Sequence, residues 1–315
     1  MVSAVIFVAT SCVSPLTGFA FWETNLAYEG ESIYNYLQVK NLSDRTILST
    51  NVLFGVQSVT MKDKGLTGMY YDTALAAPAL ADNANSALIL GMGTGTYARQ
   101  LKQYYPKMNI TGVEIDQKIT DLAGEYFDEP ADIPVTTYDG RAWLAASHDK
   151  YDVIMVDAYQ DITIPFQMSS TEFFTMVREH LNPGGVMVVN MNMISDGQGS
   201  INEALSDTIA SVFGNGNTLT ADVPNTTNRE LFAKKPGSGS EENSMQQASK
   251  ALNLRETTYE RTGSEDLEWY MEEVASRFRK VNEPDSASTI LTDDKAPVEV
   301  LGMHAICLLY TSPSP

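Results

Sequence analysis

Four groups of residues in the middle of the chain could do chemistry, because each follows an apolar run long enough to be one buried strand. The groups are the glycine turn 91–95 after the run 86–90, Glu114 after 110–113, Asp139 after 135–138 and Asp157 after 151–156. Parallel strands bring their carboxyl ends to one edge of a sheet, and ligands of open α/β sheets bind outside that edge. We therefore expect the turn and the three acids to surround one ligand.

The glycine turn, Gly91-Met92-Gly93-Thr94-Gly95, connects the first of these strands to a helix. Its glycines allow the backbone to approach a ligand closely. An acid about 20 residues further on, here Glu114, can accept hydrogen bonds from ribose hydroxyls, as in a nucleotide-type βαβ unit. The spacing is Gly-x-Gly-x-Gly and not Gly-x-Gly-x-x-Gly, so the turn alone also fits a tight connection that binds nothing.

The two later acids favour the ligand-binding interpretation. One acid after a strand is common by chance, but three in successive units suit a ligand with several hydrogen-bond donors, such as a nucleoside together with an amine. Alkyl ammonium groups titrate at about pH 10, so an amine that reacts must first lose a proton to a positioned base. Asp157 could bind the cation and take that proton, although it could also be a cap or turn residue of the following loop.

The elements that must position these residues alternate as strands and helices between residues 86 and 233. The expected helices are Tyr97–Tyr105, Ile119–Phe127, Arg141–Ala146, Ser170–Leu181 and Ile201–Phe213, and the later strands are Val186–Asn190 and Glu230–Ala233. This alternation is typical of a parallel sheet with helices on both faces. It predicts the α/β class and a Rossmann-like catalytic domain over residues 73–235, which an alanine-rich helix opens at 73–80.

Two regions flank that domain. Residues 22–72 hold short β-prone runs separated by turn residues, and they predict a small N-terminal antiparallel β-hairpin module. Residues 236–315 begin with a linker rich in Gly, Ser and Glu and continue with a helical extension, in which a helix is expected over 267–281. The last residues, 307–315, resemble nothing that should follow and carry no argument.

The first 21 residues are apolar and uncharged, and three interpretations of them compete. The segment lacks the positive start of a signal peptide, and Pro15 and Gly18 interrupt it. It is of borderline length for a spanning helix. It could be the remnant of a membrane helix, an atypical signal or anchor, or a buried strand. We expect a cytoplasmic protein and favour a membrane-related role for this segment.

Composition excludes several classes of function. The 315 residues carry a formal net charge of -19, which argues against nucleic acid as a partner because phosphate binding needs clustered Lys and Arg. The negative field suits a cationic substrate, although solubility or a salty habitat explains it more simply. The two cysteines, Cys12 and Cys307, and the three histidines are scattered, so neither a metal site nor a disulfide framework is expected.

Several motifs together resemble the spermidine synthase-like family, the polyamine aminopropyltransferases, which have the class I S-adenosylmethionine-dependent methyltransferase fold. The matching stretches are Glu31–Tyr36, Gly55–Gln57, Tyr70–Asp72, Val113–Asp116, Asp139–Gly140, Tyr151–Asp157, Phe173–Phe174 and Leu181–Gly185. The resemblance covers roughly residues 29–233. The segment Leu291–Val298 is similar to the end of synthase-like domains that are fused to transporter-like membrane segments.

The resemblance implies a role for each site residue. The donor, decarboxylated S-adenosylmethionine, would be held by Gln57, Gly91, Gly93, Gly95, Glu114 at the ribose, and Asp139 with Gly140 at the adenine. Asp157 would orient the attacking amine and help to deprotonate it, and Tyr70 and Asp161 would bind the amine substrate. The expected reaction transfers an aminopropyl group to putrescine or a related polyamine and releases methylthioadenosine. A homodimer without a metal ion would be in keeping with the family.

Three features depart from the family pattern. Thr94 stands where the family usually carries an acid, and Asp161 lies one place later than the family's second loop acid, with no adjacent proline. The C-terminal part shows no clear match to the residues with which the family binds the second end of the amine. An acid at position 94 would repel the carboxylate of intact S-adenosylmethionine, and Thr94 does not. A methyltransferase that uses intact S-adenosylmethionine therefore stays open, as does a non-catalytic nucleoside-binding domain, because a fold alone does not determine function.

Overall fold

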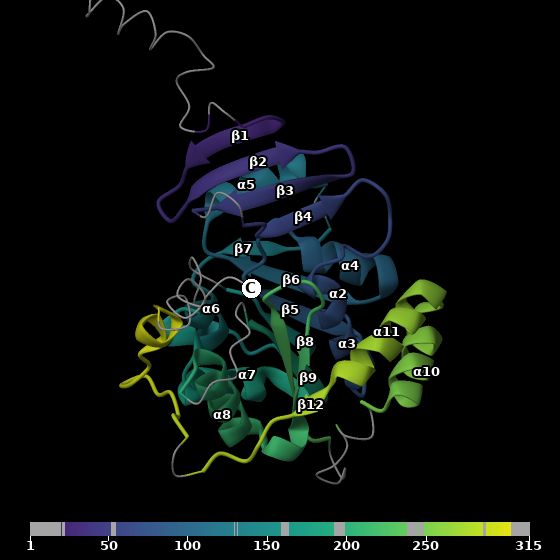
Figure 1. The fold of residues 1–315 in the computed structure, drawn as a ribbon, viewed down its shortest axis with the longest axis vertical. Coiled ribbons are helices and arrows are strands. Elements are labelled where there is room, and N and C mark those ends of the chain that lie inside the picture. The colour runs from purple at the N-terminus through teal and green to yellow at the C-terminus, as the bar shows by residue number, and fades with distance from the viewer. Residues whose placement is uncertain are drawn as a thin grey trace, which may run out of the picture.

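The computed structural model describes residues 20, 23–51, 55–128, 130, 132–158, 164–191, 199–237, 245, 249–285 and 288–303. Within this part of the chain, a four-stranded N-terminal sheet lies against one end of a larger eight-stranded sheet (Figure 1). Apart from Ala20, the apolar segment 1–21 lies outside the described residues, and so do both cysteines and the tail 307–315. No helix of the described residues is long and apolar enough to cross a bilayer.

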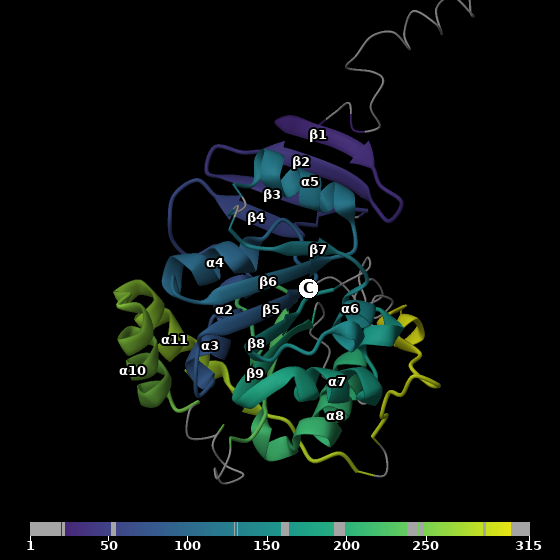
Figure 2. The same cartoon turned by 180° about the vertical axis from the view of Figure 1, so that it is seen from behind.

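The N-terminal sheet is antiparallel throughout, in the order β1-β2-β3-β4. Its strands are β1 (Leu26–Glu31), β2 (Tyr36–Asn41), β3 (Arg45–Thr50) and β4 (Ser58–Met61). Helix α5 (Gln117–Tyr126) lies across β2 and β3 (Figure 2), where Leu37 and Leu48 pack against Leu122 and Phe127. This confirms the predicted antiparallel module and shows that the larger domain covers its apolar face.

The eight-stranded sheet has the order β12-β10-β11-β9-β8-β5-β6-β7. Its strands are β5 (Ser86–Leu90), β6 (Asn109–Glu114), β7 (Val135–Thr137), β8 (Tyr151–Val156), β9 (Leu181–Met191), β10 (Thr218–Asp222), β11 (Arg229–Lys234) and β12 (Arg279–Lys280). Strands β5 to β9 are parallel, whereas β10, β11 and β12 run antiparallel to their neighbours. The expectation of a purely parallel sheet is wrong at this end. The six-residue connection 223–228 is too short for a crossover and forces a hairpin.

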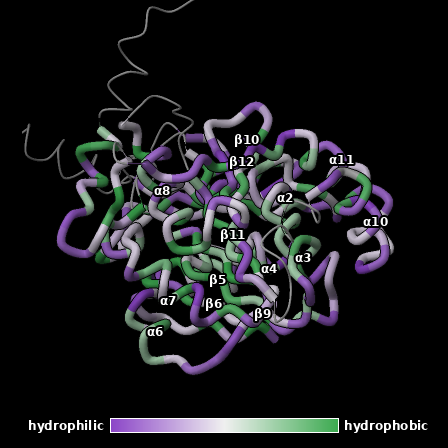
Figure 3. Tube along the Cα trace, turned by 90° about the horizontal axis from the view of Figure 1, so that it is seen from below, coloured by the Kyte–Doolittle hydropathy of each residue, from purple (hydrophilic) through white to green (hydrophobic). Residues whose placement is uncertain are grey.

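Helices cover both faces of this sheet, which confirms the Rossmann-like α/β fold. One face carries α2 (Tyr70–Ala74), α3 (Ala76–Leu80), α4 (Thr96–Tyr104), α10 (Ala251–Thr262) and α11 (Glu265–Arg277). The other carries α6 (Gly140–Ala146), α7 (Thr171–His180) and α8 (Ile201–Phe213), with the short turns η2 (Phe166–Met168) and η3 (Asn215–Asn217) nearby. Figure 3 shows hydrophobic segments, β5 among them, toward the middle of the molecule and more polar segments toward the outside. Strand β5 contributes Ala87 and Ile89 to one core and Leu88 and Leu90 to the other.

Three local expectations need correction. The alanine-rich helix starts at Tyr70 and is divided at Leu75 into α2 and α3. Residues 182–185 are not a free turn but the beginning of β9, where Gly184 has a φ of +77°. Helix α10 lies in a region for which only a linker and one later helix were expected. It packs against α3 and α11, so its formation depends on contacts with other elements, which a local sequence pattern does not reveal.

The order of the strands determines where along the edge of the sheet a ligand would bind. The chain adds β6 and β7 on one side of β5 and then returns to add β8 and β9 on the other. The carboxyl ends of β5 and β8 therefore border the point where the strand order reverses, which is where open α/β sheets bind ligands. The two ends are in contact, since the Asp157 N–H donates a 2.9 Å hydrogen bond to the carbonyl oxygen of Leu90.

Candidate functional site

A cavity of about 330 Å³ lies at this edge, between the N-terminal sheet and the carboxyl ends of the central strands. Most of the predicted site residues line it, namely Gln57, Tyr70, Gly91, Gly93, Glu114, Asp139, Gly140 and Asp157. The remaining wall is formed mainly by Tyr34, Leu48, Ser58, Tyr71, Met92, Ile115, Tyr138, Pro165, Gln167 and Met168. The mixture of apolar walls with a few convergent polar groups is typical of a small-molecule site.

Two glycines of the turn lie where a side chain would clash with neighbouring parts of the chain. Gly91 has a φ of +87°, and a Cβ atom there would lie 2.4 Å from the backbone oxygen of Asp157. Gly93 has a φ of +55°, and a Cβ atom there would lie 2.7 Å from Oγ of Ser58. Both positions therefore require glycine. Gly95 caps the N-terminus of α4 and does not line the cavity, so its place does not support a direct contact with the donor.

Glu114 ends β6 and is held by backbone groups. Its Oε2 accepts a 2.8 Å hydrogen bond from the N–H of Gly93, and its Oε1 accepts one of 3.0 Å from the N–H of Asp116. The residue is only 6% exposed. Burial raises the pKa of its carboxyl group, and the two backbone hydrogen bonds oppose that rise. The carboxylate therefore has a fixed direction at the cavity wall, as a ribose-binding acid needs.

Asp157 follows β8 and is held by two side chains. The hydroxyl of Tyr70 donates a 2.7 Å hydrogen bond to Oδ2, and the amide of Asn190 donates one of 2.9 Å to Oδ1. Loss of hydration raises the pKa of Asp157 to about 7, the nearby charge of Glu114 adds to the rise, and the hydrogen bonds from Asn190 and Tyr70 oppose it. A carboxyl group with this pKa can exchange a proton near neutral pH, which is what a general base needs.

Asp139 both caps a helix and lines the cavity. It is the N-cap of α6, where its Oδ1 accepts a 2.8 Å hydrogen bond from the N–H of Ala142. It also lines the cavity beside Tyr138 and Gly140. The cap holds the turn after β7 in place. At the cavity wall, the carboxylate of Asp139 could accept a hydrogen bond from the amino group of a nucleobase.

Of two further positions that the sequence singled out, one lies away from the cavity wall and the other lies outside the described residues. Thr94 is fully buried and does not line the cavity, and its N–H donates a 3.2 Å hydrogen bond to Oγ of Ser58. The side chain thus makes no contact with the space in which a donor would lie. Asp161 lies outside the described residues, so its predicted role in binding the amine stays a prediction.

Sequence reasoning missed the partners of these residues. Asn190 is a polar residue near the end of an apolar strand, so the criterion that identified the acids would have found it. Tyr71 lies next to Tyr70 in the sequence, and its hydroxyl donates a 2.7 Å hydrogen bond to the carbonyl of Gln57. Gln167 has no local signal, because it reaches the cavity only through the path of the chain after β8. Among the described residues, no group of three or more His, Cys, Asp or Glu side chains could hold a metal ion.

Comparison with known proteins gives a consistent family. The family described as spermine/spermidine synthase domain matches residues 69–235, which is more than half of the chain. A polyamine aminopropyltransferase of Corynebacterium efficiens is 37% identical over 131 residues, covering 38% of this chain and 25% of that protein. A polyamine aminopropyltransferase of Vibrio vulnificus is 28% identical over 209 residues, covering 63% of this chain and 69% of that protein.

Solved structures support the same fold. A probable spermidine synthase from Corynebacterium glutamicum superposes with a TM-score of 0.59 at 22% identity, covering 85% of this chain and 99% of that one. A spermidine synthase in complex with the transition-state analogue AdoDATO gives a TM-score of 0.55 at 20% identity, covering 68% and 75%. The chain spans 25% to 69% of the length of the first curated relatives that it matches.

Proposed function

Because this chain belongs to the spermine/spermidine synthase domain family, we propose that it is an aminopropyltransferase that joins a nucleoside sulfonium donor to a small amine. The single observation that carries the proposal is the contact of Tyr70 and Asn190 with Asp157 at the wall of the cavity. The contact holds the carboxyl group in place, and loss of hydration raises its pKa to about 7, so that it can act as a base near neutral pH. The same cavity holds the two acids, Glu114 and Asp139, that suit a nucleoside.

The residues of the chain divide the work of the proposed reaction. Gly91 and Gly93 leave room for the donor, Glu114 accepts from its ribose, Asp139 accepts from its adenine amino group, and Gln57 and Gly140 complete the donor side of the cavity. The donor contributes a sulfonium, which is a good leaving group. The chain therefore mainly has to bring the reactants together in line.

Asp157 carries the proton in this proposal. It binds the ammonium form of the acceptor with Tyr70 and takes one proton from it, which frees the nitrogen lone pair. The nitrogen then forms a bond to the donor carbon beside sulfur, the carbon–sulfur bond breaks, and its electron pair stays on sulfur. The products are a secondary ammonium and methylthioadenosine. The nitrogen keeps the two protons that it still carries and takes over the positive charge of the sulfonium, and Asp157 releases the proton it accepted to solvent.

Decarboxylated S-adenosylmethionine is the proposed donor, and putrescine or a related polyamine is the proposed acceptor. A spermidine synthase that shares this fold has been solved in complex with the transition-state analogue AdoDATO. The named curated relatives are polyamine aminopropyltransferases. Thr94 does not bias the choice between intact and decarboxylated donor by direct contact, since it does not line the cavity.

The test is to incubate the purified chain with putrescine and, separately, with each donor, and to identify the products by mass spectrometry. We expect spermidine and methylthioadenosine from the decarboxylated donor. Formation of S-adenosylhomocysteine from the intact donor would replace the proposal with a methyltransferase. Tight binding of either donor without any turnover would replace it with a nucleoside-binding domain.

Three further expectations stay proposals. The boundaries at residues 72 and 235 divide the chain into a β module, a catalytic domain and an extension, and limited proteolysis would test them. A homodimer can be tested by sedimentation of the purified chain. Association of a cytoplasmic protein with membranes through residues 1–21 can be tested by flotation of the full chain with lipid vesicles.

A further inference from the structure

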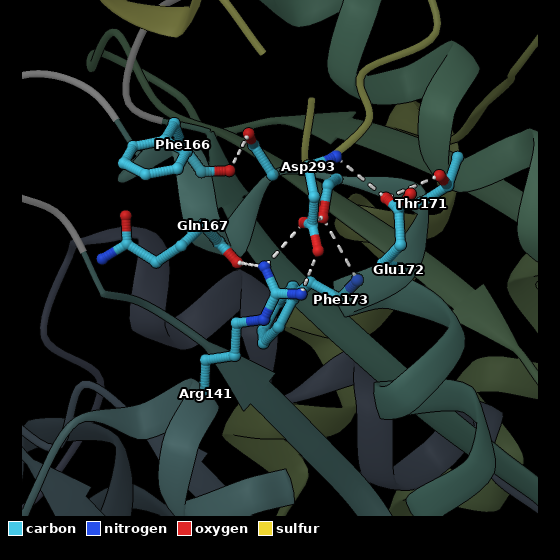
Figure 4. A network of polar contacts seen from close by, with 9 residues as sticks. Arg141, Phe166, Gln167, Thr171, Glu172, Phe173 and Asp293 are labelled. Atoms are coloured by element: carbon cyan, nitrogen blue, oxygen red, sulfur yellow. Dashed lines mark hydrogen bonds and ion pairs between the residues drawn. The ribbon is translucent and has the colours of Figure 1, made fainter. Parts of the chain in front are cut away.

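Arg141 follows two cavity residues, Asp139 and Gly140, but its guanidinium meets the C-terminal segment 288–303 (Figure 4). Nη1 donates a 2.7 Å hydrogen bond to Oδ1 of Asp293, and Nη2 donates one of 2.6 Å to Oδ2. Two parallel hydrogen bonds of this kind fix the orientation of both groups more strictly than a single ion pair does. A residue near the end of the described chain is thereby joined to the turn after β7.

The same guanidinium also holds part of the cavity wall. Nη1 of Arg141 donates a second hydrogen bond of 2.7 Å, to the carbonyl oxygen of Gln167 (Figure 4). Gln167 belongs to η2, and Pro165, Gln167 and Met168 line the cavity. The wall packs closely on the turn after β7, since a Cβ atom on Gly140 would lie 3.6 Å from Cε of Met168. One nitrogen thus joins the wall to Asp293.

Asp293 is itself held by helix α7. The hydroxyl of Ser170, the N-cap of α7, donates a 2.5 Å hydrogen bond to Oδ1 of Asp293. The N–H of Asp293 donates one of 3.1 Å to Oε2 of Glu172 (Figure 4). The N–H of Thr171 donates one of 2.9 Å to the carbonyl of the fully buried Leu291. The segment around Asp293 therefore has a fixed place against α7.

Stability alone does not account for this arrangement. The side chains of Arg141 and Asp293 are 21% and 40% exposed, and exposed ion pairs add little to the free energy of folding. The guanidinium of Arg141 and the hydroxyl of Ser170 lower the pKa of Asp293, and Asp293 raises the pKa of Arg141, so both groups are charged. The guanidinium of Arg141 binds both Asp293 and a backbone carbonyl of the cavity wall, and this arrangement is better suited to fixing the position of the wall.

We propose that Asp293 is a positioning residue, which acts through Arg141 to fix the wall Pro165–Met168 against Gly140 on the donor side of the cavity. Asp293 does not line the cavity and touches no reactant. The consequence for catalysis rests on the proposed function, whereas the fixing of the wall does not.

The structural half of the proposal is tested by amide hydrogen exchange of the full chain. Asp293→Asn keeps the size of the side chain and removes its charge. Asp294→Asn is the matched control, because Asp294 is the neighbouring exposed acid and does not contact the network. We expect exchange in residues 164–170 to become about tenfold faster in Asp293→Asn, since local opening costs less when a charge-assisted contact is lost. Equal exchange in the two variants would overturn the proposal.

The functional half is tested by steady-state kinetics of the same variants. We expect Asp293→Asn to raise KM for the donor about tenfold with kcat changed less than about twofold, because only the wall of the binding site is loosened. Arg141→Lys, which keeps the charge and loses the fork, is expected to behave in the same way. A donor KM that stays at the Asp294→Asn value in both variants would overturn the proposal. If the wild-type chain transfers no aminopropyl group, the proposed function fails. The exchange experiment would still show whether Asp293 fixes the wall Pro165–Met168.

Discussion

Glu114 and Asp157 end strands on the two sides of β5 and face one cavity, but they are held in different ways. Backbone N–H groups of Gly93 and Asp116 hold Glu114, whereas the side chains of Tyr70 and Asn190 hold Asp157. Burial raises the pKa of both carboxyl groups, and in both cases the hydrogen bonds oppose the rise. For Asp157 the loss of hydration outweighs the donors Asn190 and Tyr70 and brings the pKa to about 7. Two acids that end strands on either side of β5 thus differ in the groups that hold them, and Asp157 can exchange a proton near neutral pH.

The largest expected effect is that of Asp157→Asn on transfer. The amide has the same shape but cannot accept the proton, so kcat should fall about 100-fold to 10,000-fold while the dissociation constant of the donor stays within about twofold. Rapid-quench kinetics and calorimetry measure the two quantities. Asp149→Asn, which changes an exposed acid just before the same strand, is the control for the fold. Loss of donor binding in Asp157→Asn would make Asp157 a donor-binding residue and remove the contrast.

Glu114→Gln should do the opposite. The N–H groups of Gly93 and Asp116 lose a charged acceptor, and the ribose loses one too, so the donor should bind about tenfold to 100-fold more weakly. Transfer at saturating donor should change less than that. Calorimetric titration with methylthioadenosine measures the affinity, and Glu179→Gln, an exposed acid on α7, is the control. Unchanged affinity for methylthioadenosine would show that Glu114 does not bind the ribose.

The pH profile sharpens the role of Asp157. Only the ionised carboxylate accepts a proton, so kcat/KM for the amine should rise as pH increases through about 7. Tyr70 donates to the carboxylate and lowers its pKa, so Tyr70→Phe should move this rise about half a unit to one unit toward higher pH.

The control for that shift is Tyr105→Phe, which changes a buried tyrosine that does not line the cavity. A profile that moves toward lower pH in Tyr70→Phe, or that moves equally in both variants, would contradict the assignment of the base.

The smallest expected effect concerns stability. The pKa of Asp157 is 3.8 without the fold and about 7 within it, so the native state holds more protons between these values and loses stability as pH rises through that window. The Asp157→Asn variant has no carboxyl group at this position, so its stability does not fall in this pH window for that reason. Its melting temperature should therefore exceed that of the wild type at pH 8, by an amount on the order of 5 °C, and the excess should shrink toward pH 4.

Thermal unfolding followed by circular dichroism at the two pH values measures this difference. Glu114→Gln is the comparison: burial also raises the pKa of Glu114, against the hydrogen bonds from Gly93 and Asp116, so its melting temperature relative to the wild type should likewise be higher at pH 8 than at pH 4. An excess for Asp157→Asn that does not depend on pH would show that its carboxyl group titrates normally.

Much of the site followed from the sequence because each part is local. Gly91, Glu114, Asp139 and Asp157 each come directly after their own strand, and parallel strands must bring their ends together. The same reasoning was wrong where the fold depends on distant contacts. The sheet ends in antiparallel strands, and α10 is stabilised by its neighbours α3 and α11.

The sequence by itself therefore determined which edge of the sheet carries the chemistry and which residue types gather there. Only the tertiary structure decided which groups hold each of them. The contact of Asn190 with Asp157 joins residues 33 positions apart, and that of Arg141 with Asp293 joins residues 152 apart. No local spacing specifies such pairs. They arise because neighbouring strands and helices pack in one arrangement, which also removes Thr94 from the cavity and withdraws Asp157 from bulk water.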